Sequence, residues 1–136
     1  MQVSDVMTCD VVGIDASQSV LAAAKVMAKN EVGALLVTDG GHLVGLVTER
    51  DIVVRAVAGG LELTRAFISD IMTRGVFSCL SDAPLWEAQQ LMEAHSVGRL
   101  VAVDREGAVE GIISLEHLAT APERELAQPA PHLASQ

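Results

Sequence analysis

The chain has 136 residues, of which 50% are apolar, and carries a formal net charge of −9. This composition supports one domain, or two half-domains that share a core, and the negative charge argues against binding to nucleic acid or to an anionic membrane surface. The apolar runs are shorter than the roughly 20 residues that span a bilayer, and Met1 leads into the first motif without a signal-peptide pattern, so we expect a cytoplasmic protein.

The sequence contains the same pattern twice. Val3-Ser4-Asp5-Val6-Met7-Thr8 returns as Ile68-Ser69-Asp70-Ile71-Met72-Thr73, and Gly45-Leu46-Val47-Thr48 returns as Gly111-Ile112-Ile113-Ser114. A period of about 65 residues is too long for a helical solenoid unit and suits a compact α/β unit. We therefore expect repeat one over 1–60, a connector over 61–67, repeat two over 68–121 and a disordered tail over 122–136.

The first copy predicts the order β-α-β-β-α, with Ser17 as the N-cap of its first helix and a hairpin turn at Asp39–His42. The predicted elements are a strand over 11–14, a helix over 18–30, strands over 34–38 and 43–48, and a helix over 49–58 that stops at Gly59-Gly60.

The second copy predicts the same order. Asp82 is expected to cap a helix that carries Pro84 in its first turn. The other elements are strands over 76–79, 99–104 and 109–113, and a helix over 115–119 that Pro122 cuts short. The strand runs are apolar without strict alternation, so we expect each sheet to be covered on both faces or packed against another copy. Two small sheets that face each other, related by pseudo-two-fold symmetry and flanked by helices, satisfy this pattern. Leftover apolar surface favours a homodimer.

The segment Gly45-Leu46-Val47-Thr48-Glu49-Arg50-Asp51 is the strongest candidate for chemistry. A strand ends at Thr48 and a helix begins at once, with three free backbone N–H groups that attract phosphate. The Thr48 hydroxyl can bond a phosphate or sugar oxygen. The Asp51 carboxylate, one turn into the helix, can accept both hydroxyls of a ribose, as acidic residues do in dinucleotide-binding folds.

Spacing alone also permits a structural interpretation, in which Thr48 and Asp51 form a capping box and only satisfy backbone donors. Repeat two leaves both interpretations open. Ser114 keeps the cap, whereas His117 replaces the carboxylate. Arg50 is a second phosphate candidate, although a solvated helix face is its ordinary role. His117 could donate a hydrogen bond to a phosphate or tune binding near neutral pH, but a surface or capping role is the more ordinary one.

The two copies together resemble a pair of cystathionine β-synthase (CBS) domains, also called a Bateman module. The matching residues are Val6-Met7-Thr8, Ala23 with Met27, Val32 to Val37, and Gly45 to Ile52, which contains the family motif glycine-apolar-x-Thr/Ser-x-x-Asp. The resemblance covers about residues 3–120, and the layout is similar to stand-alone CBS-pair proteins.

This resemblance implies a regulatory sensor, without a required cofactor, that binds AMP, ADP, ATP or a related adenosyl ligand in the cleft between the repeats. It implies that Asp51 holds the ribose and Thr48 a ribose or phosphate oxygen. By the same resemblance the base is walled by Val12, Gly13, Ile14, Ala34 and Leu35, and Arg99 holds phosphate. His117 stands where the second ribose carboxylate belongs, and Glu116 stands where relatives carry a basic residue. Because of His117 we expect one good site rather than two. The carboxylate of Glu116 would repel a polyphosphate, which favours AMP or an uncharged adenosyl tail over ATP.

Two further function classes stay open from the sequence. The first is a ligand-free dimeric interaction scaffold, in which Thr48 and Asp51 only cap a helix. The second is an enzyme, which is the least favoured because the sequence shows neither a nucleophile with its base nor a paired-carboxylate pattern, and its four histidines lack metal-ligand spacing.

Cys9 and Cys79 are not equivalent in the repeat, so we expect them to be reduced, with a redox-sensitive or intermolecular disulfide as the alternative. A sensor implies a regulated protein that the sequence does not identify.

Overall fold

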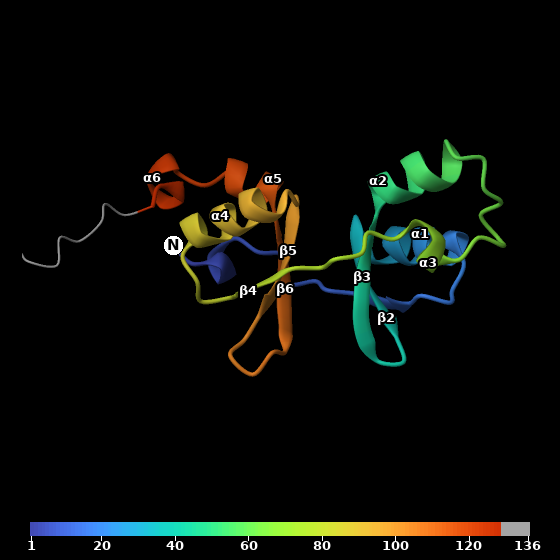
Figure 1. The fold of residues 1–136 in the computed structure, drawn as a ribbon, viewed down its shortest axis with the longest axis horizontal. Helices are drawn as coiled ribbons and strands as arrows, with labels where there is room; N and C mark the ends of the chain where they lie inside the picture. Colours follow the sequence, from blue (N-terminus) through green and yellow to red (C-terminus); the bar gives the residue numbers. More distant parts are fainter. Residues whose placement is uncertain (129–136) are drawn as a thin grey trace, which may run out of the picture. The chain divides into compact units, whose positions relative to one another are not determined.

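Residues 1–128, which the computed structural model describes, form two three-stranded sheets of the same topology, each flanked by helices (Figure 1). In each sheet the first strand pairs parallel with the second, and the second pairs antiparallel with the third. The elements of the first sheet and its helices are β1 (Gly13–Asp15), α1 (Val20–Asn30), β2 (Ala34–Asp39), β3 (His42–Thr48), α2 (Glu49–Asp51), η2 (Ile52–Val57) and α3 (Ile68–Ile71). The remaining elements are η1 (Val3–Asp5), β4 (Ser78–Leu80), α4 (Leu85–His95), β5 (Arg99–Val103), β6 (Val109–Ser114), α5 (Leu115–Ala119) and α6 (Glu123–Leu126). The α/β class and the repeated β-α-β-β-α order are confirmed.

The chain divides into two compact units that exchange their leading segments. One unit comprises Asp10–Val76, and the other joins Met1–Cys9 to the chain from Phe77 onward. The motif Val3–Thr8, which opens repeat one, therefore lies with the sheet of repeat two (β4–β6). The motif Ile68–Thr73, which opens repeat two, lies with the sheet of repeat one (β1–β3). Backbone bridges fix this arrangement, since Thr8 pairs with Ile112 on β6 and Thr73 pairs with Leu46 on β3.

Helix α1 is amphipathic and covers the core of the Asp10–Val76 unit. Its residues Val20, Ala23 and Met27 are buried, at the i, i+3, i+7 spacing of one helical face. The predicted N-cap is wrong by two positions, because the Ser19 hydroxyl accepts a hydrogen bond from the Ala22 N–H at 3.0 Å. Ser17 instead donates its backbone N–H and its hydroxyl to Asp15 in the turn before the helix.

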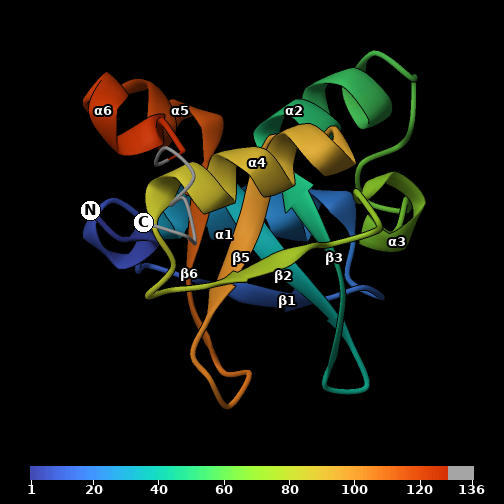
Figure 2. The ribbon, with the colours of Figure 1, turned by 60° about the vertical axis from the view of Figure 1, so that its left-hand side comes forward.

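Helix α4 holds the equivalent place in the other unit (Figure 2). It buries Leu85, Ala88 and Met92. The expected cap at Asp82 is wrong. Pro84 occupies the N-cap position, and the Asp82 carboxylate pairs with Arg105 at 2.9 Å. A proline suits a helix start because its missing N–H has no partner there in any case.

Two further segments differ from the sequence-based expectation. The helix expected over 49–58 is a single α-turn followed by the π-helix η2, a wider turn that occurs often at functional sites. The tail expected to be disordered over 122–136 begins with the short helix α6, and Glu125 on it pairs with the N-terminal amine at 3.0 Å. The rest of that expectation, over 129–136, lies outside the described residues. Within residues 1–128, no helix combines the length and the apolar character needed to cross a membrane.

Candidate functional site

Thr48 and Asp51 meet where β3 runs directly into α2. The Thr48 N–H donates to Asp51 Oδ2 at 3.0 Å, and the Asp51 N–H donates to Thr48 Oγ1 at 3.1 Å. Both residues are buried, with exposures of 8% and 6%. These reciprocal bonds form a complete capping box, so Thr48 and Asp51 do have the capping role that their spacing permits.

The expectation of three free backbone N–H groups at this helix start is wrong. The Glu49 N–H donates to the carbonyl of Gly33 at 3.0 Å, and the Asp51 N–H is used by Thr48. Two of the three donors are therefore satisfied within the protein. The backbone at this point therefore has few N–H groups left to bind a phosphate, and the Asp51 carboxylate is the group that could bind a ligand.

Two residues that the sequence analysis did not identify complete the surroundings of this carboxylate. Thr73 Oγ1 lies 3.2 Å from Asp51 Oδ1 and 3.2 Å from Asp51 Oδ2. Arg55 Nε lies 3.7 Å from Oδ1, and its Nη1 donates to the carbonyls of Ile71 and Met72 at 3.3 Å. The guanidinium thus caps the C-terminal end of α3 and offsets the buried charge of Asp51.

The second unit repeats this geometry with a histidine. The Ser114 N–H donates to His117 Nδ1 at 2.9 Å, and His117 Nε2 lies 3.0 Å from Thr8 Oγ1. A backbone N–H can only donate, so Nδ1 is the acceptor and the ring proton resides on Nε2. The pKa of His117 is lowered, first by burial, with Glu116 raising it and Arg99 lowering it further. His117 is therefore held as the neutral ring.

The other residues expected at the site fall into two equivalent groups. On the first sheet Ala34 pairs with Thr48, and on the second sheet Arg99 pairs with Ser114. Each cap thus has one of the expected residues beside it on the neighbouring strand. Arg50 is exposed on α2.

The expected base wall is only partly open. The Leu35 side chain is fully buried in the apolar core, and Val12 and Ile14 pack against that core. Gly13 is exposed and pairs with Leu36, the next residue along β2. Side chains alternate along a strand, so Ala34 faces away from the core while Leu35 faces into it. Of the expected wall residues, Gly13 is thus exposed, Val12, Ile14 and Ala34 are half-buried, and Leu35 is buried.

The glycines that open the two motifs have a steric role. A Cβ added at Gly45 would lie 2.7 Å from the Thr73 carbonyl oxygen and 3.0 Å from Met72 Sδ. A Cβ at Gly111 would lie 2.7 Å from the Thr8 carbonyl oxygen. Each glycine therefore lets the leading segment approach the strand closely enough for its threonine to reach Asp51 or His117.

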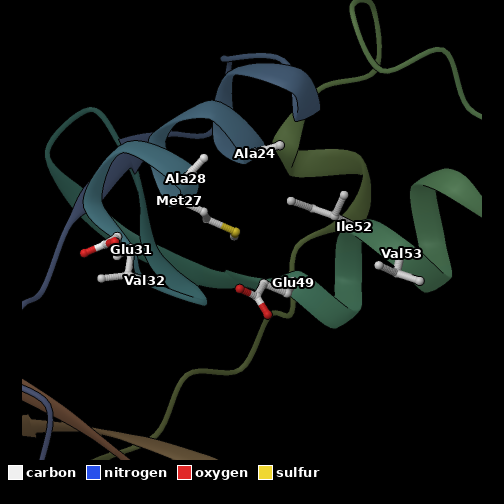
Figure 3. Close-up of a pocket in the computed structure, with 8 residues that line it drawn as sticks. All are labelled: Ala24, Met27, Ala28, Glu31, Val32, Glu49, Ile52 and Val53. Atoms are coloured by element: carbon white, nitrogen blue, oxygen red, sulfur yellow. The ribbon is translucent and has the colours of Figure 1, made fainter.

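A separate apolar pocket of about 590 Å³ lies between α1 and the α2–η2 segment. Figure 3 shows the carboxylates of Glu31 and Glu49 among its lining side chains, with Met27 and Ile52 contributing apolar surface. None of the residues expected at the site lines this pocket. The pocket and the Asp51 carboxylate are therefore different features of the same unit.

The fold and the paired caps correspond to a known family. The CBS domain family matches residues 3–57 and again residues 68–124. The chain belongs to the CBS-domain family. Its two copies together cover most of the sequence, so the expected tandem CBS pair is confirmed.

The similar proteins include a CBS domain-containing protein that the chain covers for most of its length and two CBS-domain structures solved with ligands. The chain is 36% identical over 117 residues to the CBS domain-containing protein YhcV of Bacillus subtilis, covering 86% of this chain and 82% of that protein. The structure of the CBS domain protein PAE2072 from Pyrobaculum aerophilum, complexed with AMP, aligns with a TM-score of 0.77 at 26% identity over 93% of this chain and 98% of that one. The CBS pair of protein MJ0100, in complex with 5′-methylthioadenosine and S-adenosyl-L-methionine, aligns with a TM-score of 0.72 at 28% identity, covering 88% of this chain and 93% of that one.

Some longer relatives carry enzyme names. The chain matches archaeal homoserine O-acetyltransferases but covers only 23% of their length. The match is confined to a part of each enzyme, so it transfers no acetyltransferase activity to this chain. Within residues 1–128, His, Cys, Asp and Glu side chains form no group of three or more that could hold a metal ion.

Proposed function

We propose that this CBS pair is a regulatory sensor whose Asp51 carboxylate binds the vicinal hydroxyls of an adenosyl ligand, with AMP as the first candidate. The observation that carries the proposal is the hydroxyl of Thr73, which lies at equal distances from both oxygens of Asp51. Both oxygens of the carboxylate are therefore within reach of a hydroxyl donor, which is what binding of the two ribose hydroxyls requires. Complexes of similar CBS pairs with AMP and with S-adenosyl-L-methionine support this ligand class.

One strong site per chain is proposed, at Asp51. In repeat two the equivalent residue is His117, a neutral ring whose Nδ1 already accepts from Ser114. An imidazole has one acceptor nitrogen, so it cannot take both hydroxyls of a diol as a carboxylate can. Glu116 beside it adds a negative charge that would repel a polyphosphate. AMP and uncharged adenosyl compounds are therefore favoured over ATP, with Thr48 and Arg50 as further candidate contacts of the ligand at Asp51.

Calorimetric titration of the full chain with AMP, ADP, ATP and 5′-methylthioadenosine tests the proposal. The decisive variant is Asp51→Asn, which keeps an oxygen for the Thr48 N–H and removes the charge. We expect at least about a tenfold loss of AMP affinity, because hydrogen bonds to a charged group are the strong ones. Asp5→Asn is the matched control, since Asp5 accepts the Gln2 N–H at 2.7 Å in the other unit. Equal AMP affinity in Asp51→Asn and the wild type would refute the ribose role.

The second candidate function is a ligand-free interaction scaffold. The complete capping box of Thr48 and Asp51 favours it, because these two residues then need no other role. In that case Asp51→Ala costs about 0.5–2 kcal/mol of folding free energy, as loss of a cap does, and adenosyl compounds leave the melting temperature unchanged. A melting temperature that rises with AMP concentration in the wild type would exclude the scaffold.

A homodimer is proposed for either function. The helix η2 exposes Val53, Val54 and Val57, each at 50–59%, next to the apolar pocket that Val53 also lines. Exposed apolar side chains that gather on a protein surface mark interaction sites. Sedimentation equilibrium of the wild type and of Val54→Glu tests the proposal, with a dimer in the first and a monomer in the second. The partner that a sensor would regulate is a further protein that binds one ligand state better than the other.

A further inference from the structure

The buried carboxylate of Asp51 is covered on its solvent side by two polar side chains. Asp51 is 6% exposed, whereas Thr73 is exposed and the Arg55 side chain is 53% exposed. Thr73 Oγ1 reaches both carboxylate oxygens at 3.2 Å, and Arg55 Nε lies 3.7 Å from Oδ1. A ligand can therefore reach this carboxylate only if one of the two side chains moves.

The Thr73 hydroxyl occupies the acceptor positions that a diol requires. Oδ2 already accepts the Thr48 N–H at 3.0 Å, and the single Thr73 O–H is shared between the two oxygens. A carboxylate offers about four lone-pair positions. Two ligand hydroxyls that each bond one oxygen need the space and the lone pairs that this bridging hydroxyl takes. The hydroxyl and the diol are therefore mutually exclusive.

Displacement of Thr73 needs only a side-chain rotation. Its backbone is fixed to β3, with the Thr73 N–H donating to the Leu46 carbonyl at 2.7 Å and the Leu46 N–H donating to the Thr73 carbonyl at 2.9 Å. The χ1 angle of a threonine has other staggered positions that turn the hydroxyl away. Arg55 keeps its bonds to the carbonyls of Ile71 and Met72 and continues to offset the charge of Asp51.

We propose that the Thr73 hydroxyl is an internal competitor of the ligand, which occupies Asp51 in the free protein and sets the affinity of the site for vicinal diols. This inference rests on the proposed diol-binding role of Asp51. It makes Thr73 a residue that determines affinity although it lies outside the glycine-to-aspartate motif. The ligand must break a hydrogen bond to an ionised carboxylate before it forms its own, so affinity is lower than the bare carboxylate would give.

The test is Thr73→Val, which keeps the shape of the side chain and removes the donor. Thr8→Val is the matched control, because Thr8 ends the other copy of the leading motif and contacts His117. Binding of AMP and of 2′,3′-dideoxy-AMP is measured by calorimetry for the wild type, both variants, Thr73→Ser and Asp51→Asn. We expect Thr73→Val to bind AMP about tenfold more tightly, which is the loss of one charge-assisted competitor. Thr73→Ser and Thr8→Val should bind AMP as the wild type does.

The dideoxy ligand separates competition from a general change in the site. It has no diol for Asp51, so Thr73→Val should leave its affinity unchanged, and an equal gain for both ligands would overturn the inference. Equal or weaker AMP binding in Thr73→Val, with Asp51→Asn still impaired, would overturn the inference and leave the proposed function intact. AMP binding that is absent throughout, or that Asp51→Asn does not alter, would overturn both. Thr73→Ala carries the same expectations if Thr73→Val does not fold.

Discussion

Thr8 and Thr73 end the two copies of the leading motif, and each touches the third residue of a motif helix in the opposite repeat. Thr73 bonds Asp51 of repeat one, and Thr8 contacts His117 of repeat two. Each cap is therefore completed by a segment that the order of the sequence assigns to the other copy. The chemistry of either cap depends on how closely that segment approaches the strand.

The close approach depends on Gly45, so we predict that Gly45→Ala is destabilising. The added Cβ would lie 2.7 Å from the Thr73 carbonyl oxygen, a backbone atom that cannot turn away as a side chain does. The leading segment must shift, and overpacking of this kind costs about 1–3 kcal/mol. Urea denaturation of the wild type and the variant measures the change in the free energy of unfolding.

Gly13→Ala is the matched control for this prediction. Gly13 also lies in a strand of the same sheet, but an added Cβ would be 3.8 Å from the Leu36 carbonyl oxygen, an ordinary contact. We expect Gly13→Ala to leave stability nearly unchanged. Similar losses in the two variants would show that the close approach at Gly45 has no energetic consequence.

Much of this fold could be predicted because the same sequence pattern occurs twice in the chain. The hairpin at Asp39–His42 and the strand-to-helix junction at Thr48 are set by local turn and capping chemistry, and both are observed. The predicted ends of the helices are less accurate than their predicted order. Ser17 and Ser19 are both capable caps, and Asp15 decides between them by taking both donors of Ser17.

The surroundings of Asp51 could not be predicted in the same way. Thr73 was visible as the echo of Thr8, but nothing local indicates that each leading segment lies against the sheet that follows the other copy. Arg55 follows Asp51 at the i, i+4 spacing of helical ion pairs, which is a usable signal. Its bonds to Ile71 and Met72 are contacts between distant segments, and one sequence does not show these.

The two cysteines should differ sharply in reactivity. Cys9 is exposed, whereas Cys79 is buried in the core beneath α4. Burial, followed by the nearby charge of Glu87, raises the pKa of the Cys79 thiol to about 11. The thiolate is the reactive form, so at about pH 8 Cys79 is protected by both its low ionisation and its position.

Titration of the native protein with a thiol-specific chromophore checks this prediction. One thiol per chain should react quickly, and the second should react only after denaturant is added. Cys9→Ser should remove the fast phase, and Cys79→Ser should leave it unchanged. A fast phase that survives in Cys9→Ser would contradict the burial of Cys79.

The histidine cap of repeat two should make stability depend on pH. The folded protein lowers the pKa of His117 below 6.5, its ordinary value, first through burial and also through Arg99, although Glu116 acts in the opposite sense. Between the two pKa values the unfolded chain binds more protons than the folded one. The stabilisation is therefore fully present above pH 6.5 and is lost as the pH falls from there through the lowered pKa. The local reason is geometric. Nδ1 now accepts a hydrogen bond from the Ser114 N–H, and protonation of Nδ1 would bring two N–H groups face to face.

His117→Asn keeps an acceptor for the Ser114 N–H and removes the titrating group. The free energy of unfolding, measured by urea denaturation in steps from about pH 7.5 to about pH 4.5, should fall less steeply below pH 6.5 in this variant than in the wild type. His42→Asn is the control, because it removes an exposed histidine at the start of β3, away from the Ser114 cap. Parallel curves for His117→Asn and the wild type throughout this range would show that protonation of His117 is not what lowers the stability.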